Sequence, residues 1–118
     1  MDFYRRVEKA CMMVPYGKVA SYGQIALLCQ KPNNSRQVGY ALGHRVLKSD
    51  VPAHRIVNSR GELSGRGAFD TFDTQQRRLE EEGILLYEEN RVDLKKYGWK
   101  NTLEDALELE AIFTKLGI

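Results

Sequence analysis

The residues best suited to chemistry in this sequence are His54 and Arg55, which follow Pro52 and Ala53 in the segment VPAHRIV. A neutral imidazole can act as a general base, and a neighbouring guanidinium can hold an anion or an aromatic face. Ala53 carries no reactive group, although the proline fixes the backbone in front of it. The segment is therefore either an ordinary strand that carries a histidine or a catalytic loop that lacks its nucleophile.

Two cysteines, Cys11 and Cys29, are the other candidate nucleophiles. Both fall on the apolar faces of expected helices, far along the chain from His54, and burial among apolar groups raises the pKa of a thiol. We expect neither to react. The cysteines and histidines also lack the spacing of metal ligands, so we expect neither a metal nor a cofactor.

The charge of the chain is divided between its halves. Residues 1–60 contain ten Lys and Arg against three Asp and Glu, a net charge of +7, whereas residues 61–118 contain eight against thirteen, a net charge of −5. A basic half favours a nucleic-acid partner, or it is an ordinary solvated surface. The composition is that of a soluble globular protein, with neither a membrane-length apolar run nor a signal peptide, so we expect it in the cytoplasm. No dimerisation element is obvious unless the C-terminal helix is one, so we expect a monomer, and a DNA partner would place it at the nucleoid.

The elements that position these residues can be predicted from local signals. We expect a helix over residues 2–14, ended by the next proline, and a second helix that begins at Ser21. Ser21 and Gln24 have the pattern of a capping box, in which each side chain bonds the backbone of the other. After the turn KPNN, Ser35 is expected to cap a short helix over residues 35–43.

The second and third helices form a helix-turn-helix candidate. Three apolar residues of the third helix should face inward: Val38, Ala41 and Leu42. Three polar or aromatic residues should face outward: Arg36, Gln37 and Tyr40. Helical pairs of this kind also occur in ordinary cores, but basic residues surround this one: Lys31, Arg36, Arg45, Lys48 and Arg55. The cluster favours DNA binding.

The second half of the chain should contribute short strands and two more helices. We expect a strand over residues 54–57, a turn at NSRG and a helix from Asp70 or Thr71 to Gly83. That helix should pack inward through Phe72, Leu79 and the stem of Arg77 or Gln76. A hairpin over residues 84–94 and a C-terminal helix capped by Asn101 or Thr102 should follow. The predicted fold class is mostly α with short β hairpins, a winged helix-turn-helix-like DNA-binding domain.

As a set, several motifs resemble the DNA-binding domain of the O6-alkylguanine-DNA alkyltransferases. The chain is most similar to the alkyltransferase-like proteins, in which the acceptor cysteine of the Pro-Cys-His-Arg motif is replaced. The resemblance runs from about Tyr4 to Trp99, and it suggests a DNA-binding domain over residues 1–100 with a helical extension over 101–118. Its landmarks are GKVASYGQIA, SRQVGYAL, PAHRIV, the pair Ser64 and Gly65, the segment ending LEEEG, and VDLKKYGW.

The resemblance implies a role for most of these residues. Ala53 stands where the family has its acceptor cysteine, and His54 and Glu82 stand where the family activates that thiol. Without a thiolate, transfer of an alkyl group should be abolished. Arg36 would enter the duplex as a finger, and Tyr22 would crowd the 3′ phosphate. The implied DNA-binding residues are Tyr22, Ser35, Arg36, Gln37, Tyr40 and Arg45. The implied lesion pocket comprises Tyr22, Pro52, Ala53, His54, Ser64, Gly65, Arg66 and Glu82.

Two positions depart from the family pattern. Alkyltransferase-like proteins most often have tryptophan at the position of Ala53, so this pocket should accept adducts bulkier than methyl. Alkyltransferases usually have an asparagine hinge at the position of Arg45, and arginine cannot both donate and accept as an amide does. Arg66 follows the alkyltransferase-like pattern, and its guanidinium could stack on a purine.

The function that these observations predict is a non-enzymatic DNA damage sensor. It would bind O6-alkylguanine in double-stranded DNA, flip the damaged base out of the helix, and flag it for nucleotide excision repair. Two alternatives stay open. One is an active alkyl acceptor or hydrolase that uses another residue, and the other is a helix-turn-helix transcriptional regulator.

Overall fold

The computed structural model describes residues 1–48, 50–63, 69, 71, 73–88 and 90–118. The elements run α1 (Phe3–Met13), β1 (Ala20–Ser21), α2 (Tyr22–Leu28), α3 (Ser35–Gly43), the 3₁₀ turn η1 (Ala53–Arg55), β2 (Ile56–Val57), α4 (Thr74–Glu81), β3 (Leu86–Tyr87), β4 (Arg91–Val92), α5 (Leu94–Tyr97) and α6 (Leu103–Leu116). The prediction of a mostly helical chain with short β structure is confirmed. No helix of the described part of the chain is long and apolar enough to span a membrane.

The helix ends follow the local sequence signals. Asp2 caps α1 by accepting from the backbone N–H of Arg5, and α1 stops at Met13 because Val14, which precedes a proline, is extended. Thr102 and Asp105 form a capping box at the start of α6. These boundaries agree with the predicted ones.

Two predicted caps were wrong in detail. Ser21 does accept from the N–H of Gln24, but the amide of Gln24 donates to the Trp99 carbonyl and to Asn101 rather than back to the cap. Ser35 is the first residue of α3 and not its cap, because the cap position is taken by Asn34. The amide of Asn34 donates to the side chain of Gln37. In the first case the distant Trp99 carbonyl and Asn101 take the side chain that the local pattern assigns to the cap.

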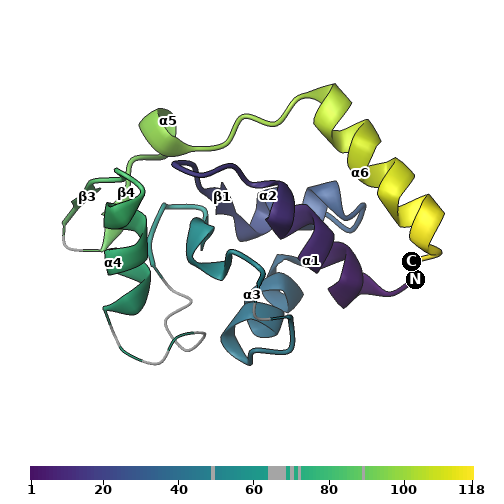
Figure 1. Ribbon diagram of the computed structural model, residues 1–118, viewed down its shortest axis with the longest axis horizontal. Coiled ribbons are helices and arrows are strands. Elements are labelled where there is room, and N and C mark those ends of the chain that lie inside the picture. The colour runs from purple at the N-terminus through teal and green to yellow at the C-terminus, as the bar shows by residue number, and fades with distance from the viewer. Residues whose placement is uncertain (49, 64–68, 70, 72, 89) are drawn as a thin grey trace.

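The apolar side chains form two clusters on either side of the β1–β2 pair. The strands pair in parallel, with Ala20 opposite Ile56 and Ser21 opposite Val57. Successive residues of a strand point to opposite faces, so Ile56 enters the cluster of α1, α2, α3 and α6, whereas Val57 enters the cluster beneath α4 and the hairpin. Figure 1 shows these two parts of the molecule side by side, with η1 between them. The segment PAHRIV therefore lies where the two clusters meet.

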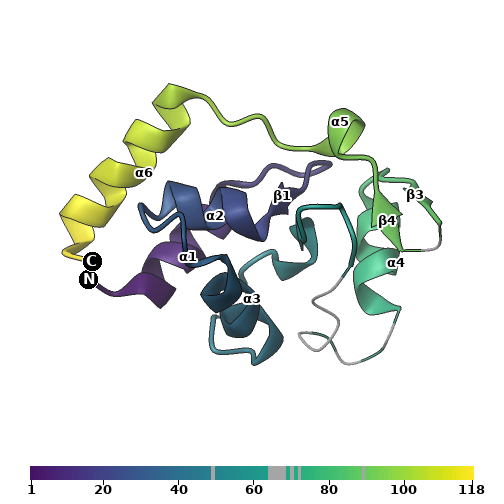
Figure 2. The same ribbon diagram turned by 180° about the vertical axis from the view of Figure 1, so that it is seen from behind.

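The last helix lies along α1 and brings the two chain ends together, as both views show (Figures 1 and 2). Phe113 is buried beneath the guanidinium of Arg6, whose carbon lies 4.6 Å from the ring centre. Arg6 also donates to the carbonyls of Ile118 and Cys29. Three leucines of α6 are exposed: Leu103, Leu107 and Leu116. The helix α6 contacts the domain through Leu109, Phe113 and the partly buried Ala106.

The helix α4 differs from its prediction in its start and its buried face. It begins at Thr74, after Asp73, and not at Asp70 or Thr71. Thr74 and Gln75 are its buried polar residues, whereas Arg77 is exposed and Gln76 is half-buried. Leu79 is buried as expected, and Phe72 and Asp70 lie outside the described residues.

Candidate nucleic-acid interface

The segment after Pro52 is a tight turn and not the start of a strand. The N–H of Arg55 donates to the Pro52 carbonyl at 3.0 Å, so Ala53, His54 and Arg55 form one 3₁₀ turn before β2 begins at Ile56. The predicted strand over residues 54–57 was wrong for its first half. The turn places Ala53, His54 and Arg55 side by side in a half-buried position.

The carboxylate of Glu82 holds this turn in place. One of its oxygens lies 2.6 Å from Nε2 of His54, and both accept from Nε of Arg55 at 3.0 Å. The backbone N–H of Gly17 donates to the same carboxylate at 2.8 Å. Arg55 also donates to the carbonyl of Val14 at 2.9 Å, at the end of α1. The side chain of Glu82 is only 6% exposed, so these donors take the place of water.

Glu82 reaches this position because α4 ends there. The N–H of Ile84 donates to the carbonyl of Leu79 and that of Gly83 to the carbonyl of Glu80, which is the Schellman pattern. Gly83 has φ +82, which glycine adopts at no steric cost. The predicted stop at Gly83 is confirmed, and the turn leaves the Glu82 side chain directed at His54 and Arg55.

The protonation states follow from this geometry. Burial would raise the pKa of Glu82, but the hydrogen bonds from Arg55, Gly17 and His54 outweigh it and hold that pKa below its ordinary value. Burial lowers the pKa of His54, and the charges of Arg55 and Arg78 add to this effect against the pull of Glu82. At neutral pH a neutral His54 therefore donates through Nε2 to a carboxylate that can only accept, which leaves a lone pair on Nδ1.

That lone pair could deprotonate a nucleophile, but the adjacent residue offers a methyl group. Ala53 is half-buried and packs against the larger apolar cluster. The two cysteines cannot replace a thiol at position 53, because both are buried in the same cluster. Burial raises the pKa of both thiols, that of Cys29 to about 12. Their predicted burial is confirmed.

The helix pair brings most of the expected DNA-contacting residues together. On α3, Arg36, Gln37 and Tyr40 are exposed, as predicted, while Val38, Ala41 and Leu42 are buried. The ring of Tyr40 stacks on His44, with ring centres 4.0 Å apart. Tyr22, the first residue of α2, lies against α3 so closely that a Cβ on Gly39 would sit 3.9 Å from its ring. Tyr22 packs on the cluster that also supports Ala53, so the helix pair and the turn share one core.

Arg45 has a left-handed backbone conformation although it is not an asparagine. Its φ is +54, in the left-handed region that asparagine and glycine occupy most readily. The N–H of Val46 donates to the Ala41 carbonyl and that of Arg45 to the Leu42 carbonyl, which closes the end of α3 as a Schellman motif. The loop that leads to Pro52 is also held, because the Lys48 N–H donates to the buried carboxylate of Glu8 at 2.7 Å.

Three expected pocket residues, Ser64, Gly65 and Arg66, lie outside the described residues. Sequence reasoning also missed two residues that hold this site together, Gly17 and Gln75. Gln75 is 1% exposed and donates to the carbonyls of His54 and Ile56. Its position seven residues before Glu82, two turns along the same helix face, was the signal that could have identified it.

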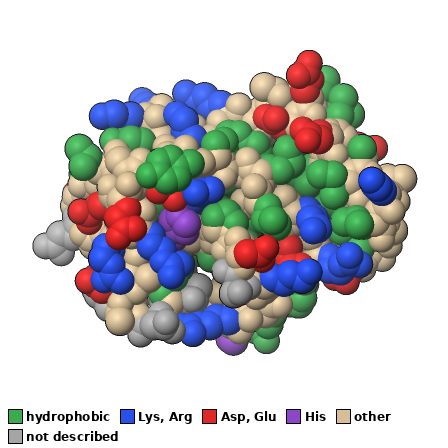
Figure 3. Space-filling view, in the orientation of Figure 1, with side chains coloured by type: hydrophobic (Ala, Val, Ile, Leu, Met, Phe, Trp, Pro, Cys, Tyr) green, Lys and Arg blue, Asp and Glu red, His purple; other side chains and the backbone are tan. Residues whose placement is uncertain are grey.

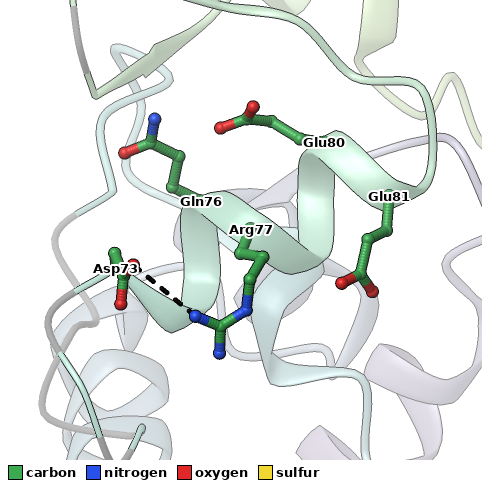
Figure 4. A pocket seen from close by; sticks show the side chains of 5 residues that line it. All are labelled: Asp73, Gln76, Arg77, Glu80 and Glu81. Carbon is green, nitrogen blue, oxygen red and sulfur yellow. Dashed lines mark ion pairs between the residues drawn. The ribbon is translucent and has the colours of Figure 1, made fainter.

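The outer face of α4 carries charged side chains that do not form a site. Four of them, together with the uncharged Gln76, line a shallow hollow there: Asp73, Arg77, Glu80 and Glu81 (Figure 4). Arg77 pairs with Asp73 at 3.5 Å, but both side chains are more than half exposed, and Gln76 and Glu80 point away from Arg77. Within the described ranges, no group of three or more His, Cys, Asp or Glu residues could hold a metal ion.

One charge cluster stands out on the face in Figure 3. Basic side chains lie along both the lower edge and the upper left edge of this view, and acidic side chains gather over the first turns of α6. The helix α6 contains four acidic residues, Glu104, Asp105, Glu108 and Glu110, and one lysine, Lys115. A polyanion would therefore be repelled from the start of α6.

Comparison with known proteins gives a consistent result. Residues 2–84 match the model of the 6-O-methylguanine DNA methyltransferase DNA-binding domain. The chain is 42% identical over 103 residues to alkyltransferase-like protein 1 of Schizosaccharomyces pombe, covering 84% of this chain and 95% of that protein. It is 34% identical over 98 residues to the DNA base-flipping protein of Escherichia coli, covering 83% and 74%.

Solved structures agree with these relatives. The S. pombe protein Atl1 in complex with damaged DNA containing O6-carboxymethylguanine matches with a TM-score of 0.76 at 42% identity, over 86% of this chain and 98% of that one. The Mycobacterium tuberculosis protein OGT in complex with DNA matches with a TM-score of 0.61 at 39% identity, over 70% of this chain and 50% of that one.

Proposed function

Because this chain belongs to the family of the 6-O-methylguanine DNA methyltransferase DNA-binding domain, we propose that it is a sensor of O6-alkylguanine in double-stranded DNA. It binds the duplex through α3, rotates the damaged base out of the stack and holds it without removing the alkyl group. A base inside a duplex is inaccessible, so inspection requires this rotation, which costs a few kcal/mol.

The observation that carries the proposal is a complete activating network around a residue that cannot react. His54, Glu82 and Arg55 are joined by hydrogen bonds of 2.6–3.0 Å, and the neighbouring Ala53 presents only a methyl group. The chain is related to alkyltransferase-like proteins, and the lack of transfer follows from the lack of an accessible thiol.

The expected interface and pocket remain part of the proposal. Arg36 enters the duplex and fills the space of the extruded base, while Tyr22 crowds the adjacent phosphate. The remaining contacts on this side come from Ser35, Gln37, Tyr40 and Arg45. Pro52, Ala53, His54 and Glu82 form the wall of the pocket, and the residues Ser64, Gly65 and Arg66 complete it. Residues 1–100 act as the DNA-binding unit and residues 101–118 as its extension.

The placement of three residues supports this proposal. Arg36 is exposed on α3, Tyr22 packs on the core cluster that supports Ala53, and Arg45 follows α3 in a left-handed conformation. Binding through a basic face releases counterions, so affinity should fall steeply as salt rises.

The decisive experiment is a titration with matched duplexes, one carrying O6-methylguanine and one carrying guanine, at several salt concentrations. The mass of the protein is measured after each incubation. Tighter binding of the damaged duplex with an unchanged mass supports the sensor. A gain of one alkyl group or the release of an alcohol would establish an enzyme. Equal affinity for the two duplexes with a preference for particular undamaged sequences would establish a regulator.

We also propose that the DNA-bound protein, acting at the nucleoid, flags the lesion for nucleotide excision repair. A damaged base that is bound and flipped but not repaired has to be removed by another process. Deleting the gene should sensitise cells to alkylating agents, and the deletion should add nothing in cells that already lack excision repair. Additive sensitivity would exclude this route.

A further inference from the structure

The wall of the proposed base pocket is held from α4 at two points. Glu82 bonds the side chains of His54 and Arg55, and Gln75 bonds the backbone of the same segment. Gln75 and Glu82 are seven residues apart, so they lie on one face of the helix and about 10 Å apart along its axis. One end of α4 therefore bonds the side chains of the turn η1, and the other end bonds the backbone of the same segment.

The contacts of Gln75 use its full capacity as a donor. Its amide nitrogen lies 3.2 Å from the His54 carbonyl and 3.1 Å from the Ile56 carbonyl, and an amide has two hydrogens to donate. These carbonyls lie on either side of Arg55. Since both are bonded from one atom, the carbonyls of the turn cannot rotate independently, and the backbone that carries Ala53 is fixed with them.

The residue type is itself evidence that these bonds matter. Gln75 is 1% exposed, and its own carbonyl oxygen is buried without a hydrogen-bond partner among the described residues. A buried acceptor without a donor is destabilising, so leucine or methionine would suit this position better if it served only to fill space. The two donated hydrogen bonds offset the free-energy cost of burying the Gln75 carbonyl oxygen.

We propose that Gln75 is a positioning residue of the base pocket: by bonding the backbone of His54 and Ile56, it fixes Ala53 where a flipped base meets it. The proposal rests on the proposed function, because its effect is seen in lesion recognition. Gln75 need not touch DNA itself. Its loss should loosen the pocket wall and leave the exposed contacts of α3 intact.

The test is Gln75→Met, which keeps the length of the side chain and removes both donated bonds. Affinity for the O6-methylguanine duplex should fall on the order of tenfold, since two hydrogen bonds no longer order the wall. Affinity for the undamaged duplex should change by less than about twofold, since binding without a flipped base depends on phosphate contacts. Unchanged discrimination between the two duplexes would overturn the proposal.

A matched control separates positioning from stability. Leu79→Ala lies on the same helix, is fully buried and removes core packing without touching the turn. Both variants are measured well below their unfolding midpoints. Leu79→Ala should bind both duplexes as the parent chain does. If the two variants lose lesion discrimination in parallel, Gln75 acts only through general stability and the proposal is wrong.

Two further variants identify the atom that matters and keep the test decisive if Gln75→Met fails to fold. Gln75→Lys offers donors to the two carbonyls and should retain the discrimination between damaged and undamaged duplex. Gln75→Glu offers acceptors and should lose that discrimination. Equal behaviour of these two variants would overturn the proposal. If the parent chain itself shows no preference for the damaged duplex, the proposed function fails, which is a different result from a selective parent and an equally selective variant.

Discussion

Glu82 should support the fold even though no thiol remains for it to activate. Replacing it by glutamine keeps the size of the side chain but removes the charge that faces Arg55 and one acceptor for the donors of Gly17 and His54. Because its side chain is 6% exposed and that of Arg55 is 17% exposed, the guanidinium is left partly buried without its counter-ion. Removing one partner of a buried ion pair costs about 3 kcal/mol or more.

This loss should be visible in thermal unfolding at neutral pH. For a chain of this length, ~3 kcal/mol lowers Tm by roughly 10 °C. The matched control is Glu81→Gln, since Glu81 is exposed and Tyr16 bonds its backbone rather than its side chain. That variant should shift the free energy of unfolding by less than about 0.5 kcal/mol. If the two substitutions prove equally mild, the network is not structural and the reasoning fails.

The pH dependence of the free energy of unfolding gives a second test of the same prediction. The folded pKa of Glu82 is lowered, so its contribution is present above the ordinary value of 4.5 and is lost as pH falls through the folded pKa. The folded pKa of His54 is also lowered, so acid below its ordinary value of 6.5 also favours unfolding. The parent chain should therefore lose stability on acidification, and Glu82→Gln should lose less below pH 4.5. Parallel pH curves would contradict this account.

Three further predictions test the interface and the pocket. Arg36→Ala should weaken binding to the O6-methylguanine duplex on the order of tenfold, or 1.4 kcal/mol, and should weaken binding to undamaged duplex less, as a fluorescence titration would reveal. Arg45→Gly should raise Tm by roughly 3 °C, because glycine avoids about 1 kcal/mol of strain at φ +54; a lower Tm would show that the contacts of the arginine side chain outweigh this strain. The same variant should make the slope of log affinity for DNA against log salt shallower by about one. Ala53→Trp should weaken binding to O6-benzylguanine duplexes more than to O6-methylguanine duplexes, since it fills the room that alanine leaves; an equal loss for both adducts would show that position 53 does not set the size limit.

Local signals predicted most of the elements, because each depends on residues close in sequence. The proline after Val14 ends α1, Thr102 and Asp105 cap α6, and Gly83 closes α4 whatever the rest of the chain does. The inward and outward faces of α3 followed from helical periodicity in the same way. One error arose where a side chain had two possible partners. Gln24 bonds the distant Trp99 carbonyl rather than its own cap, which no local pattern encodes.

The site itself was only partly predictable for the same reason. His54 and Arg55 were recognised by type, and their partner Glu82 came from the resemblance, but the turn that presents them was expected as a strand. Three contacts could not be read from sequence spacing, because they join segments distant in the chain: Gly17 to Glu82, Arg55 to the Val14 carbonyl, and Gln75 to the His54 carbonyl. Polar residues on a buried helix face are the general sign of such contacts.

The persistence of this network beside an alanine has a physical explanation. Glu82, Arg55 and His54 depend on one another, because removing any one leaves a partner buried without its hydrogen bond or its counter-ion. A thiol at position 53 would add only a weak donor, so its replacement by a methyl group removes the reactivity at little expense to the fold. Reactivity and architecture are therefore separable at this site. On the proposed function, an intact His–Glu–Arg cluster is evidence for the local architecture, and the residue before the histidine would decide whether the site can react.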